Sequence, residues 1–303
     1  MKQQSDESVK KAMHSRQLGL KLIANVTYGY TAANFSGRMP CVEVGDSVVA
    51  KGRETLERAI KLVQKNSQWN VKVVYGDTDS MFVLVPGASR AEAFAIGQQI
   101  ADAVTADNPS PVALKLEKVY QPCILQTKKR YVGFMYESLE QEKPVYEAKG
   151  IETVRRDGCP VAVKLLQRCL CELFETGDLS RVKRIVEGTL CDLISGRVSA
   201  LDLMFTREYH GAAGYRPGAV APPNEIAKRI GSRDGRAVPR AGERVSWMVG
   251  GGAPGAALVR LARTPREVAR GHVPPHVTYY VTRAILPPLH RCLSLLGADV
   301  FKW

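Results

Sequence analysis

The six residues Tyr75–Ser80 have the sequence Y-G-D-T-D-S, and the predicted fold depends on this stretch more than on any other. An apolar run, V-K-V-V-Y at 71–75, leads into it, and a second, M-F-V-L-V at 81–85, follows it. Two β-rich runs joined by a short Gly and Asp segment predict a β-hairpin. Asp77 and Asp79 are two positions apart, so extended geometry places both carboxylates on one face of the tip.

The carboxylates of Asp77 and Asp79 form a candidate metal site. Two carboxylates so close repel each other unless a cation lies between them. Mg²⁺ takes oxygen ligands and is usually held by one or two carboxylates together with substrate phosphates. The alternative is an ordinary Asp-rich turn, because Asp and Gly are favoured turn residues. The apolar strands on both sides favour the metal site.

A helix is predicted over residues 5–28, well before the hairpin. The apolar residues Leu18, Leu22 and Val26 recur every four positions, and Gly29 follows as the expected stop.

One face of this helix suits a nucleotide. Lys21, Asn25 and Tyr28 lie at i, i+4 and i+7, hence on one side. Lys binds phosphate as a point charge, and a Tyr ring offers a flat surface for a base or sugar. A solvated helix face is the alternative that the pattern leaves open.

Residues 128–133 have the sequence K-K-R-Y-V-G. If Lys128, Lys129 and Arg130 all lie on a strand, they point to both faces, which is unfavourable unless an anion or water takes them up. A duplex backbone would do so and would make binding depend strongly on salt. The alternative is an exposed basic edge strand, which discourages aggregation.

A second basic segment, residues 149–157, has the sequence K-G-I-E-T-V-R-R-D. Gly150 would allow close approach of the backbone, and Lys149, Arg155 and Arg156 are candidate phosphate ligands.

The composition limits the class of protein. The chain has 303 residues and a formal net charge of +13, which favours an anionic partner, most commonly nucleic acid, over a merely basic surface. The seven cysteines form no C-x-x-C pair, so we expect reduced thiols. No run approaches the ~20 apolar residues of a membrane span. The polar start lacks the apolar core of a signal peptide, so we expect a soluble intracellular protein.

The remaining patterns predict an α+β chain whose texture changes near residue 150. Helices are expected at 47–66 and 89–105, β-rich sequence at 112–148, amphipathic helices at 160–176 and 179–196, irregular structure with one short helix (225–230) at 211–256, and a helix interrupted by Pro287 and Pro288 at 276–296.

In this order the segments resemble the B family of DNA polymerases. Residues 21–29, K-L-I-A-N-V-T-Y-G, resemble the fingers motif K-x-x-x-N-S-x-Y-G; residues 75–80 resemble the palm motif, 128–131 the K-K-R-Y motif, and 149–156 the start of the thumb. The resemblance covers nearly the whole chain. It implies an α+β fold, with the second fingers helix and the return to the palm over 1–38, the palm over 39–150 and a mostly helical thumb over 151–303.

The resemblance also implies an activity: addition of a deoxynucleotide (dNTP) to a primer 3′-hydroxyl in DNA replication or repair, with two Mg²⁺ ions. It makes Asp79 the ligand that bridges both ions and Asp77 a secondary or water-mediated ligand. The remaining roles are triphosphate and base contacts for Lys21, Asn25 and Tyr28, and primer–template DNA contacts for Lys128, Lys129, Arg130, Tyr131, Lys149, Arg155 and Arg156.

Some features depart from the usual family pattern. Val26 replaces the usual Ser, and residues 34–38, N-F-S-G-R, are typical of a translesion branch. The motif D-x-x-S-L-Y-P, which carries a second catalytic carboxylate, is absent, so we expect this 303-residue fragment to be inactive alone. The resemblance further implies a nuclear protein with accessory polymerase subunits, and an iron–sulfur cluster only in a C-terminal tail that this sequence lacks. Two alternatives remain, a non-catalytic nucleic-acid-binding module and a structural scaffold that depends on a partner.

Overall fold

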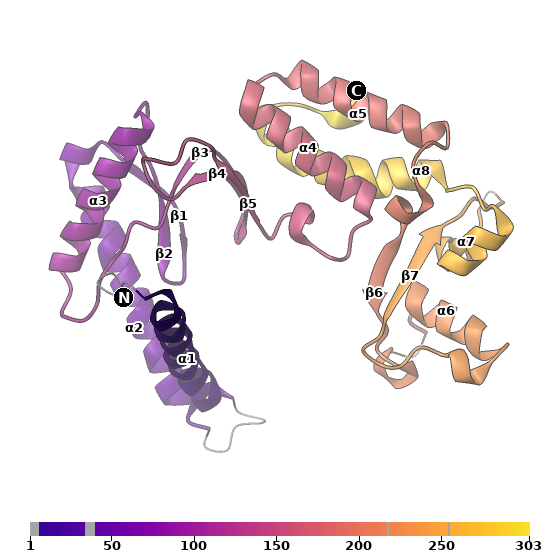
Figure 1. The fold of residues 1–303 in the computed structure, drawn as a ribbon, viewed down its shortest axis with the longest axis horizontal. Coiled ribbons are helices and arrows are strands. Elements are labelled where there is room, and N and C mark those ends of the chain that lie inside the picture. Colours follow the sequence, from indigo (N-terminus) through magenta and orange to yellow (C-terminus); the bar gives the residue numbers. More distant parts are fainter. Residues whose placement is uncertain (1–5, 34–39, 217, 254) are drawn as a thin grey trace. The chain divides into compact units, whose positions relative to one another are not determined.

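The computed structural model describes residues 6–33, 40–216, 218–253 and 255–303. Helices predominate in it, and its three small sheets are all antiparallel (Figure 1). The predicted α+β class is therefore confirmed. The chain packs as two compact units, Met1–Glu117 (unit 1) and Lys118–Trp303 (unit 2).

Unit 1 places one hairpin among long helices. Its elements are α1 (Glu7–Ala32), α2 (Val42–Lys65), a 3-10 turn (Ser67–Trp69), β1 (Lys72–Asp77), β2 (Ser80–Leu84) and α3 (Arg90–Ala106). The end of α1 lies close to the start of α2. The Cys41 N–H donates to the Thr31 carbonyl at 2.8 Å, and a Cβ added to Gly45 would lie 2.7 Å from the Cβ of Ala32.

Helix α1 begins at Glu7, two residues after the predicted start, and ends later than expected. The Asp6 carboxylate accepts from the Ser8 N–H at 2.9 Å and caps the first turn. The predicted stop at Gly29 is wrong, because the helix continues to Ala32. A single Gly inside a helix costs only about 1 kcal/mol relative to Ala, too little to end a long helix by itself.

The predicted hairpin is confirmed, and it lies on a small core. Strand β1 pairs with β2 from Lys72 opposite Leu84 to Asp77 opposite Ser80. The buried residues Ala59, Val63, Ile100 and Val104 come from α2 and α3, and hairpin residues Val73, Met81 and Val83 pack against them. This packing fixes the strands that end at the hairpin tip.

Unit 2 combines a three-stranded sheet with a helical core and a second small sheet. Its main elements are β3 (Val119–Thr127), β4 (Arg130–Tyr136), β5 (Val145–Lys149), α4 (Pro160–Thr176), α5 (Leu179–Ile194), β6 (Phe205–Glu208), α6 (Pro222–Gly231), β7 (Arg244–Val249), β8 (Ala262–Arg263), α7 (Pro265–Gly271), α8 (Val277–Tyr279), a π-helix (Tyr280–Ile285) and α9 (Leu286–Leu293). Residues 112–118, expected to be β-rich, form no strand.

The first sheet of unit 2 has the order β3-β4-β5. Thr127 pairs with Arg130, so Lys128 and Lys129 form the two-residue turn between β3 and β4. The expectation that Lys128, Lys129 and Arg130 lie together on a strand is therefore wrong for the two lysines. Lys129 has φ +60°, a left-handed conformation that suits the tight connection of a hairpin.

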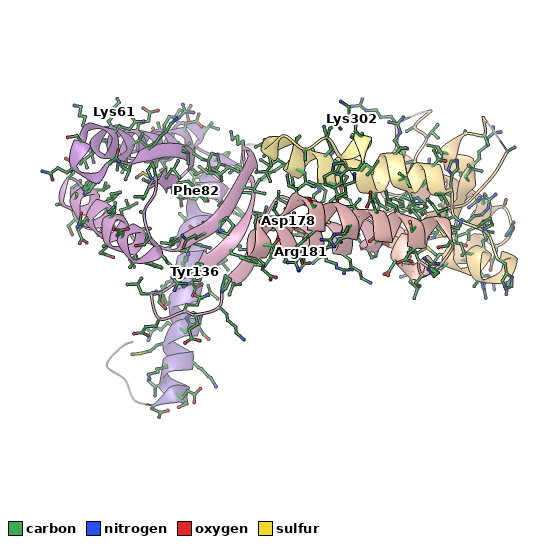
Figure 2. All side chains as sticks on the ribbon, turned by 90° about the horizontal axis from the view of Figure 1, so that it is seen from above. Lys61, Phe82, Tyr136, Asp178, Arg181 and Lys302 are labelled. Carbon is green, nitrogen blue, oxygen red and sulfur yellow. The ribbon has the colours of Figure 1, made fainter. Side chains whose placement is uncertain are left out.

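Helices α4 and α5 form the predicted amphipathic pair. Gly177 ends α4 with φ +67°, and the Asp178 carboxylate then accepts from the Ser180 N–H at 2.7 Å at the start of α5. Figure 2 labels Asp178 and Arg181 at this start. The fully buried residues Leu166 and Leu170 of α4 belong to the large core of unit 2.

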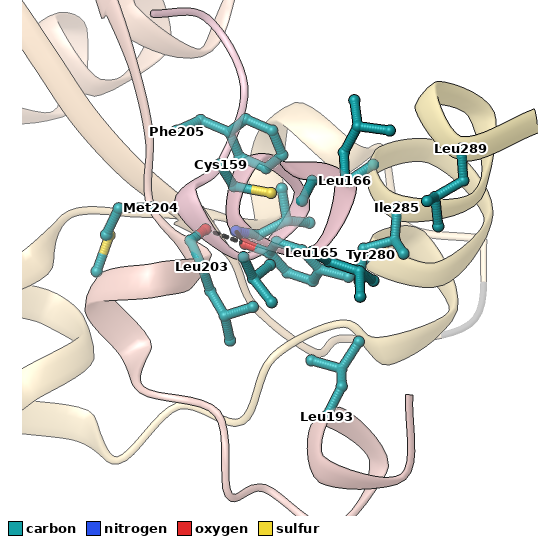
Figure 3. Packing of buried hydrophobic residues seen from close by; sticks show 14 of the residues in the cluster. Cys159, Leu165, Leu166, Leu193, Leu203, Met204, Phe205, Tyr280, Ile285 and Leu289 are labelled. Atoms are coloured by element: carbon teal, nitrogen blue, oxygen red, sulfur yellow. Dashed lines mark hydrogen bonds between the residues drawn. The ribbon is translucent and has the colours of Figure 1, made fainter. Parts of the chain in front are cut away.

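Tyr280 lies at the centre of that core with no exposed surface. Its hydroxyl donates to the Leu203 carbonyl at 2.6 Å (Figure 3) and accepts from the Val249 N–H at 3.0 Å. Tyr280 opens the π-helix, and Pro287 and Pro288, expected to interrupt a helix, lie in the first turn of α9. The expected interruption is therefore wrong, because Ile285 and Leu286 both have helical φ and ψ and α9 continues directly from the π-helix.

The region predicted to be mostly irregular contains more regular structure. Strand β7 lies inside residues 211–256 and pairs with β6, with Phe205 opposite Trp247. The short helix expected at 225–230 is the longer α6. Pairing with a strand far away in the sequence explains why the local pattern did not reveal β7.

The predicted domain boundaries at residues 38 and 150 remain predictions. The division into two compact units falls elsewhere, between Glu117 and Lys118, and concerns packing and not the predicted domains. Residues 34–38, which carry the N-F-S-G-R pattern, lie outside the described residues. Within the part of the chain that the structure describes, no helix combines the length and the apolar content needed to cross a bilayer.

Candidate functional site

The tip of the β1–β2 hairpin is a very tight turn. The Asp79 N–H donates to the Asp77 carbonyl at 2.6 Å, the i to i+2 bond of a γ-turn, and Thr78 has φ +57°. The Ser80 hydroxyl donates to the same carbonyl at 3.1 Å. A β-branched residue at positive φ is strained, and the paired strands on both sides hold it there.

The two predicted metal ligands lie on this turn. The Asp77 side chain is half-buried and accepts from the Thr78 hydroxyl at 3.2 Å. Asp79 is exposed, and its carboxylate makes no hydrogen bond or ion pair with any described residue. The γ-turn replaces the extended geometry that was expected to place both carboxylates on one face. Asp79 nevertheless offers an exposed carboxylate without a protein cation beside it, two positions from a second carboxylate, and such oxygen donors fit Mg²⁺. No group of three or more His, Cys, Asp or Glu side chains suited to a metal ion occurs within the described ranges.

The three predicted nucleotide ligands lie on α1. Lys21, Asn25 and Tyr28 are all exposed, and Tyr28 retains 47% of its surface. Their spacing places them along one face of the helix, as predicted. Lys21 forms no ion pair with the exposed Asp79 or with any other described carboxylate. The structure thus holds the carboxylate pair and the nucleotide face on separate elements of unit 1.

In unit 2 the lysine turn, Lys128 and Lys129, projects from the end of the β3–β4 hairpin. The backbone beneath it is closely packed, because a Cβ added to Gly150 would lie 2.3 Å from the Lys129 carbonyl oxygen. Gly150 itself has φ +64°. Gly150, predicted to allow close approach, does so to the lysine turn of the same chain.

Arg130 follows the lysine turn at the start of β4. Its guanidinium forms an ion pair with Glu152, and the same carboxylate oxygen accepts from Arg291 of α9 at 2.8 Å. The sheet alternation explains this direction: Arg130 and the buried Val132 lie on the face toward the core, whereas Tyr131 lies on the other. The three consecutive cations were expected to need an anion. For Arg130 this anion is Glu152 of the same chain.

The opposite face of the sheet carries Tyr131, Glu147 and Lys149. Glu147 receives hydrogen bonds from Lys118 at 2.8 Å and from the Tyr120 hydroxyl, and its other oxygen lies 3.4 Å from the Lys149 ammonium. Burial would raise the pKa of Glu147, but these hydrogen bonds and the two lysine charges outweigh burial and hold it below its usual range. Lys149, a predicted DNA ligand, is therefore paired with the Glu147 carboxylate when no DNA is bound.

Arg155 and Arg156 line a surface cavity of about 510 Å³ in unit 2. Arg155 is held by Asp157 through two bonds of 3.0 and 2.8 Å. Arg244 also lines the cavity and donates to the Arg156 carbonyl at 2.9 Å. The side chains of Arg156 and Arg207 are exposed and form no hydrogen bond or ion pair with the described residues.

The cavity thus contains basic residues that the sequence did not single out: Arg207, His210 and Arg244. The only sequence signal for the two arginines is that Arg outnumbers Lys after residue 200, and His210 has none. These residues come from β6, the loop after it and β7, so only the pairing of β6 with β7 brings them beside Arg155 and Arg156.

Comparisons with known proteins show which family the chain belongs to. The family model for DNA polymerase family B matches residues 1–296. The DNA polymerase zeta catalytic subunit of Drosophila melanogaster is 61% identical over 306 residues, covering 100% of this chain. The Homo sapiens zeta catalytic subunit is 56% identical over 98% of this chain, and the DNA polymerase delta catalytic subunit of Bos taurus is 35% identical over 97% of it.

These relatives are much longer proteins. The chain covers 14% of the Drosophila relative, 10% of the human one and 27% of the bovine one. Because the family model matches almost every residue, the chain belongs to DNA polymerase family B.

Proposed function

We propose that this chain supplies part of the active centre of a DNA-directed DNA polymerase, a nucleotidyltransferase that joins a dNTP to a primer 3′-hydroxyl. The observation that carries the proposal is the exposed Asp79 beside Asp77 on a γ-turn whose strands are anchored on α2 and α3. The family and the zeta-type relatives support it.

Asp79 and Asp77 would hold Mg²⁺ in this proposal. When bound, two such ions lower the pKa of the attacking hydroxyl and neutralise the leaving pyrophosphate. The strained turn has the role of presenting both carboxylates in one rigid arrangement, so that little reorganisation is needed during the reaction.

On α1, Lys21 and Asn25 bind the triphosphate, and Tyr28 packs against the nascent base pair. An ammonium and an amide in line along one helix face match a chain of phosphate oxygens. All three side chains are exposed, so they can reach a ligand without a change of the helix.

In unit 2, Lys128, Lys129 and Tyr131 contact the primer–template duplex, and Lys149 joins them from β5. Arg155, Arg156 and Arg207 take up further phosphates at the cavity. Such contacts recognise the shape and charge of the backbone and carry no direct sequence preference.

The finer features of the proposal rest on the resemblance of the sequence motifs: translesion synthesis, a nuclear location and accessory polymerase subunits. An iron–sulfur cluster is proposed only for the full-length protein, since no ligand set for one occurs among the described residues. The 303-residue chain alone is inactive in this proposal, because the D-x-x-S-L-Y-P carboxylate is not in its sequence.

Primer extension and nucleotide binding test the proposal together. The purified chain should not extend a primer in Mg²⁺. Extension would refute the proposal that the chain holds only part of the carboxylates needed for catalysis. The chain should bind Mn²⁺–dNTP, measured by electron paramagnetic resonance, and Asp79→Asn should weaken this binding about tenfold or more. Asp46→Asn, at an exposed position of α2, makes the same charge change and should have no effect.

The same experiment separates the alternatives. If Asp79→Asn and EDTA leave every binding property unchanged while duplex binding remains salt-sensitive, the chain is a non-catalytic nucleic-acid-binding module. If the chain binds neither duplex nor nucleotide, it is a scaffold that depends on a partner.

A further inference from the structure

Glu152 joins three separate segments of unit 2. Its carboxylate pairs with Arg130 at the start of β4 and, at 2.8 Å, with Arg291 of α9, while Glu152 itself follows β5. The Glu152 side chain is only 20% exposed and that of Arg130 only 28% exposed. The Arg130–Glu152 pair is therefore partly shielded from solvent, unlike the ordinary ion pairs of a protein surface, whereas the Arg291 side chain is 42% exposed.

Other contacts join the β3–β4 hairpin to α9 and to the connection after β5. The Gln126 amide of β3 donates to the Cys292 sulfur of α9 at 3.5 Å. Gly150, two residues before Glu152, lies against the Lys129 carbonyl so closely that no side chain fits. The backbone of the lysine turn is thus packed against the connection after β5, and the residues on either side of the turn are held to helix α9.

The charge state of Glu152 supports this role. Burial would raise the pKa of Glu152, but the Arg130 hydrogen bond and the charges of Arg291 and Arg130 outweigh burial and keep it below its usual range. Glu152 is therefore ionised at neutral pH and holds both guanidinium groups.

We propose that Arg130, Glu152 and Arg291 form a latch that fixes the Lys128–Lys129 turn to helix α9, so that Arg130 and Glu152 are positioning residues for DNA and not direct DNA ligands. The proposal rests on the proposed function, since it assigns the lysine turn to the duplex. It changes the role expected of Arg130, which sheet alternation directs away from the face that carries Tyr131.

Net charge alone and the latch predict opposite changes in duplex affinity for one substitution. Glu152→Gln makes the chain more positive and releases Arg130 and Arg291. If these arginines bind phosphate directly, the duplex should bind as tightly as before or more tightly. If they position the lysine turn, the duplex should bind more weakly despite the added positive charge.

The test measures anisotropy of a fluorescent primer–template duplex at several salt concentrations. The latch predicts that Glu152→Gln raises Kd about fivefold, whereas Glu140→Gln, an exposed residue between β4 and β5, leaves Kd unchanged or lower. Glu152→Asp, which retains the charge, should restore part of the affinity. An unchanged or lower Kd for Glu152→Gln would overturn the latch.

Arg130→Met gives a second, independent readout. Removing a direct phosphate ligand lowers the slope of log K against log salt by about 0.9. The latch predicts weaker binding with an unchanged slope for Arg130→Met, but a smaller slope for Lys128→Ala. A slope that falls equally in both variants would show that Arg130 binds phosphate and would overturn the latch.

Hydrogen exchange of the amides at residues 127–131 separates failure of the latch from failure of the proposed function. In Glu152→Gln and Arg291→Met these amides should exchange faster than in the unmodified chain, whether or not DNA binds. Unchanged exchange in both variants overturns the latch. Faster exchange in a chain that binds no duplex supports the latch and refutes the DNA-binding role of the turn.

Discussion

A Cβ added to Gly150 would lie 2.3 Å from the carbonyl oxygen of Lys129, closer than real Cβ contacts come. Gly150 follows β5, whereas Lys129 is part of the turn before β4. The pair therefore joins the lysine turn to the next connection of the same sheet. Because Gly150 has no side chain, the backbone of the lysine turn can pack directly against it.

Gly150→Ala should destabilise unit 2 by about 2–4 kcal/mol, because it adds a clash with backbone to a residue at φ +64°. Gly177→Ala is the matched control, since it has φ +67° but meets nothing within 4 Å. It should cost only about 1 kcal/mol. Urea unfolding followed by circular dichroism measures both, and equal losses would mean that the backbone near Lys129 can give way.

Replacing both Lys128 and Lys129 by Ala should weaken duplex binding and reduce its salt slope by about 2, since two phosphate contacts are lost. The control is Lys61→Ala with Lys65→Ala on α2, where Lys61 is exposed (Figure 2) and the net charge changes equally. Anisotropy at several salt concentrations gives the slopes. Equal slopes for the two double variants would show that only net charge matters.

Tyr280→Phe should cost about 2–4 kcal/mol of unfolding free energy. The change removes a hydroxyl that donates to Leu203 and accepts from Val249, and it leaves a buried carbonyl and a buried N–H without partners. Tyr279→Phe is the control, because no described hydrogen bond involves its hydroxyl. Thermal unfolding of both variants is the measurement, and similar midpoints would show that the buried bonds contribute little.

Glu147 and Glu152 should make stability depend on acid pH. Both have a pKa lowered from the ordinary value of 4.5, so their stabilising contribution is present above that value. It is lost as pH falls through the lower folded-state pKa. At pH 7, Glu152→Gln should lose about 1–3 kcal/mol, and the difference from the unmodified chain should shrink below pH 4.5. Urea midpoints from pH 7 to pH 3 test this, and a constant difference would contradict it.

The cysteines should differ sharply in reactivity. Burial raises the pKa of Cys159 and Cys292 to about 11 and that of Cys169 to about 12, whereas Cys191 is exposed. Thiol titration at pH 8 should show a fast phase that Cys191→Ser removes. The three buried thiols should react only after guanidinium unfolds the chain. Their rapid reaction in the native chain would show that the core of unit 2 opens readily.

The hairpin and the paired helices were predictable because their signals are local. Alternating apolar residues on both sides of a Gly and Asp segment specify strands and a turn, and the Ser89–Glu92 capping box marks the start of α3. Strand β7 was missed because its partner, β6, lies far away in the sequence. The end of α1 was misplaced because a single Gly is a weak stop.

For the candidate site, the sequence by itself determined the carboxylate pair of Asp77 and Asp79, the cations of the K-K-R-Y segment and membership of the polymerase family. Residue types at fixed spacing carry that information. Only the tertiary structure decided the direction of each cation. Lys128 and Lys129 lie in a turn, while Arg130 is held by Glu152 and Arg291, because hairpin register and packing against α9 depend on residues far apart in the chain.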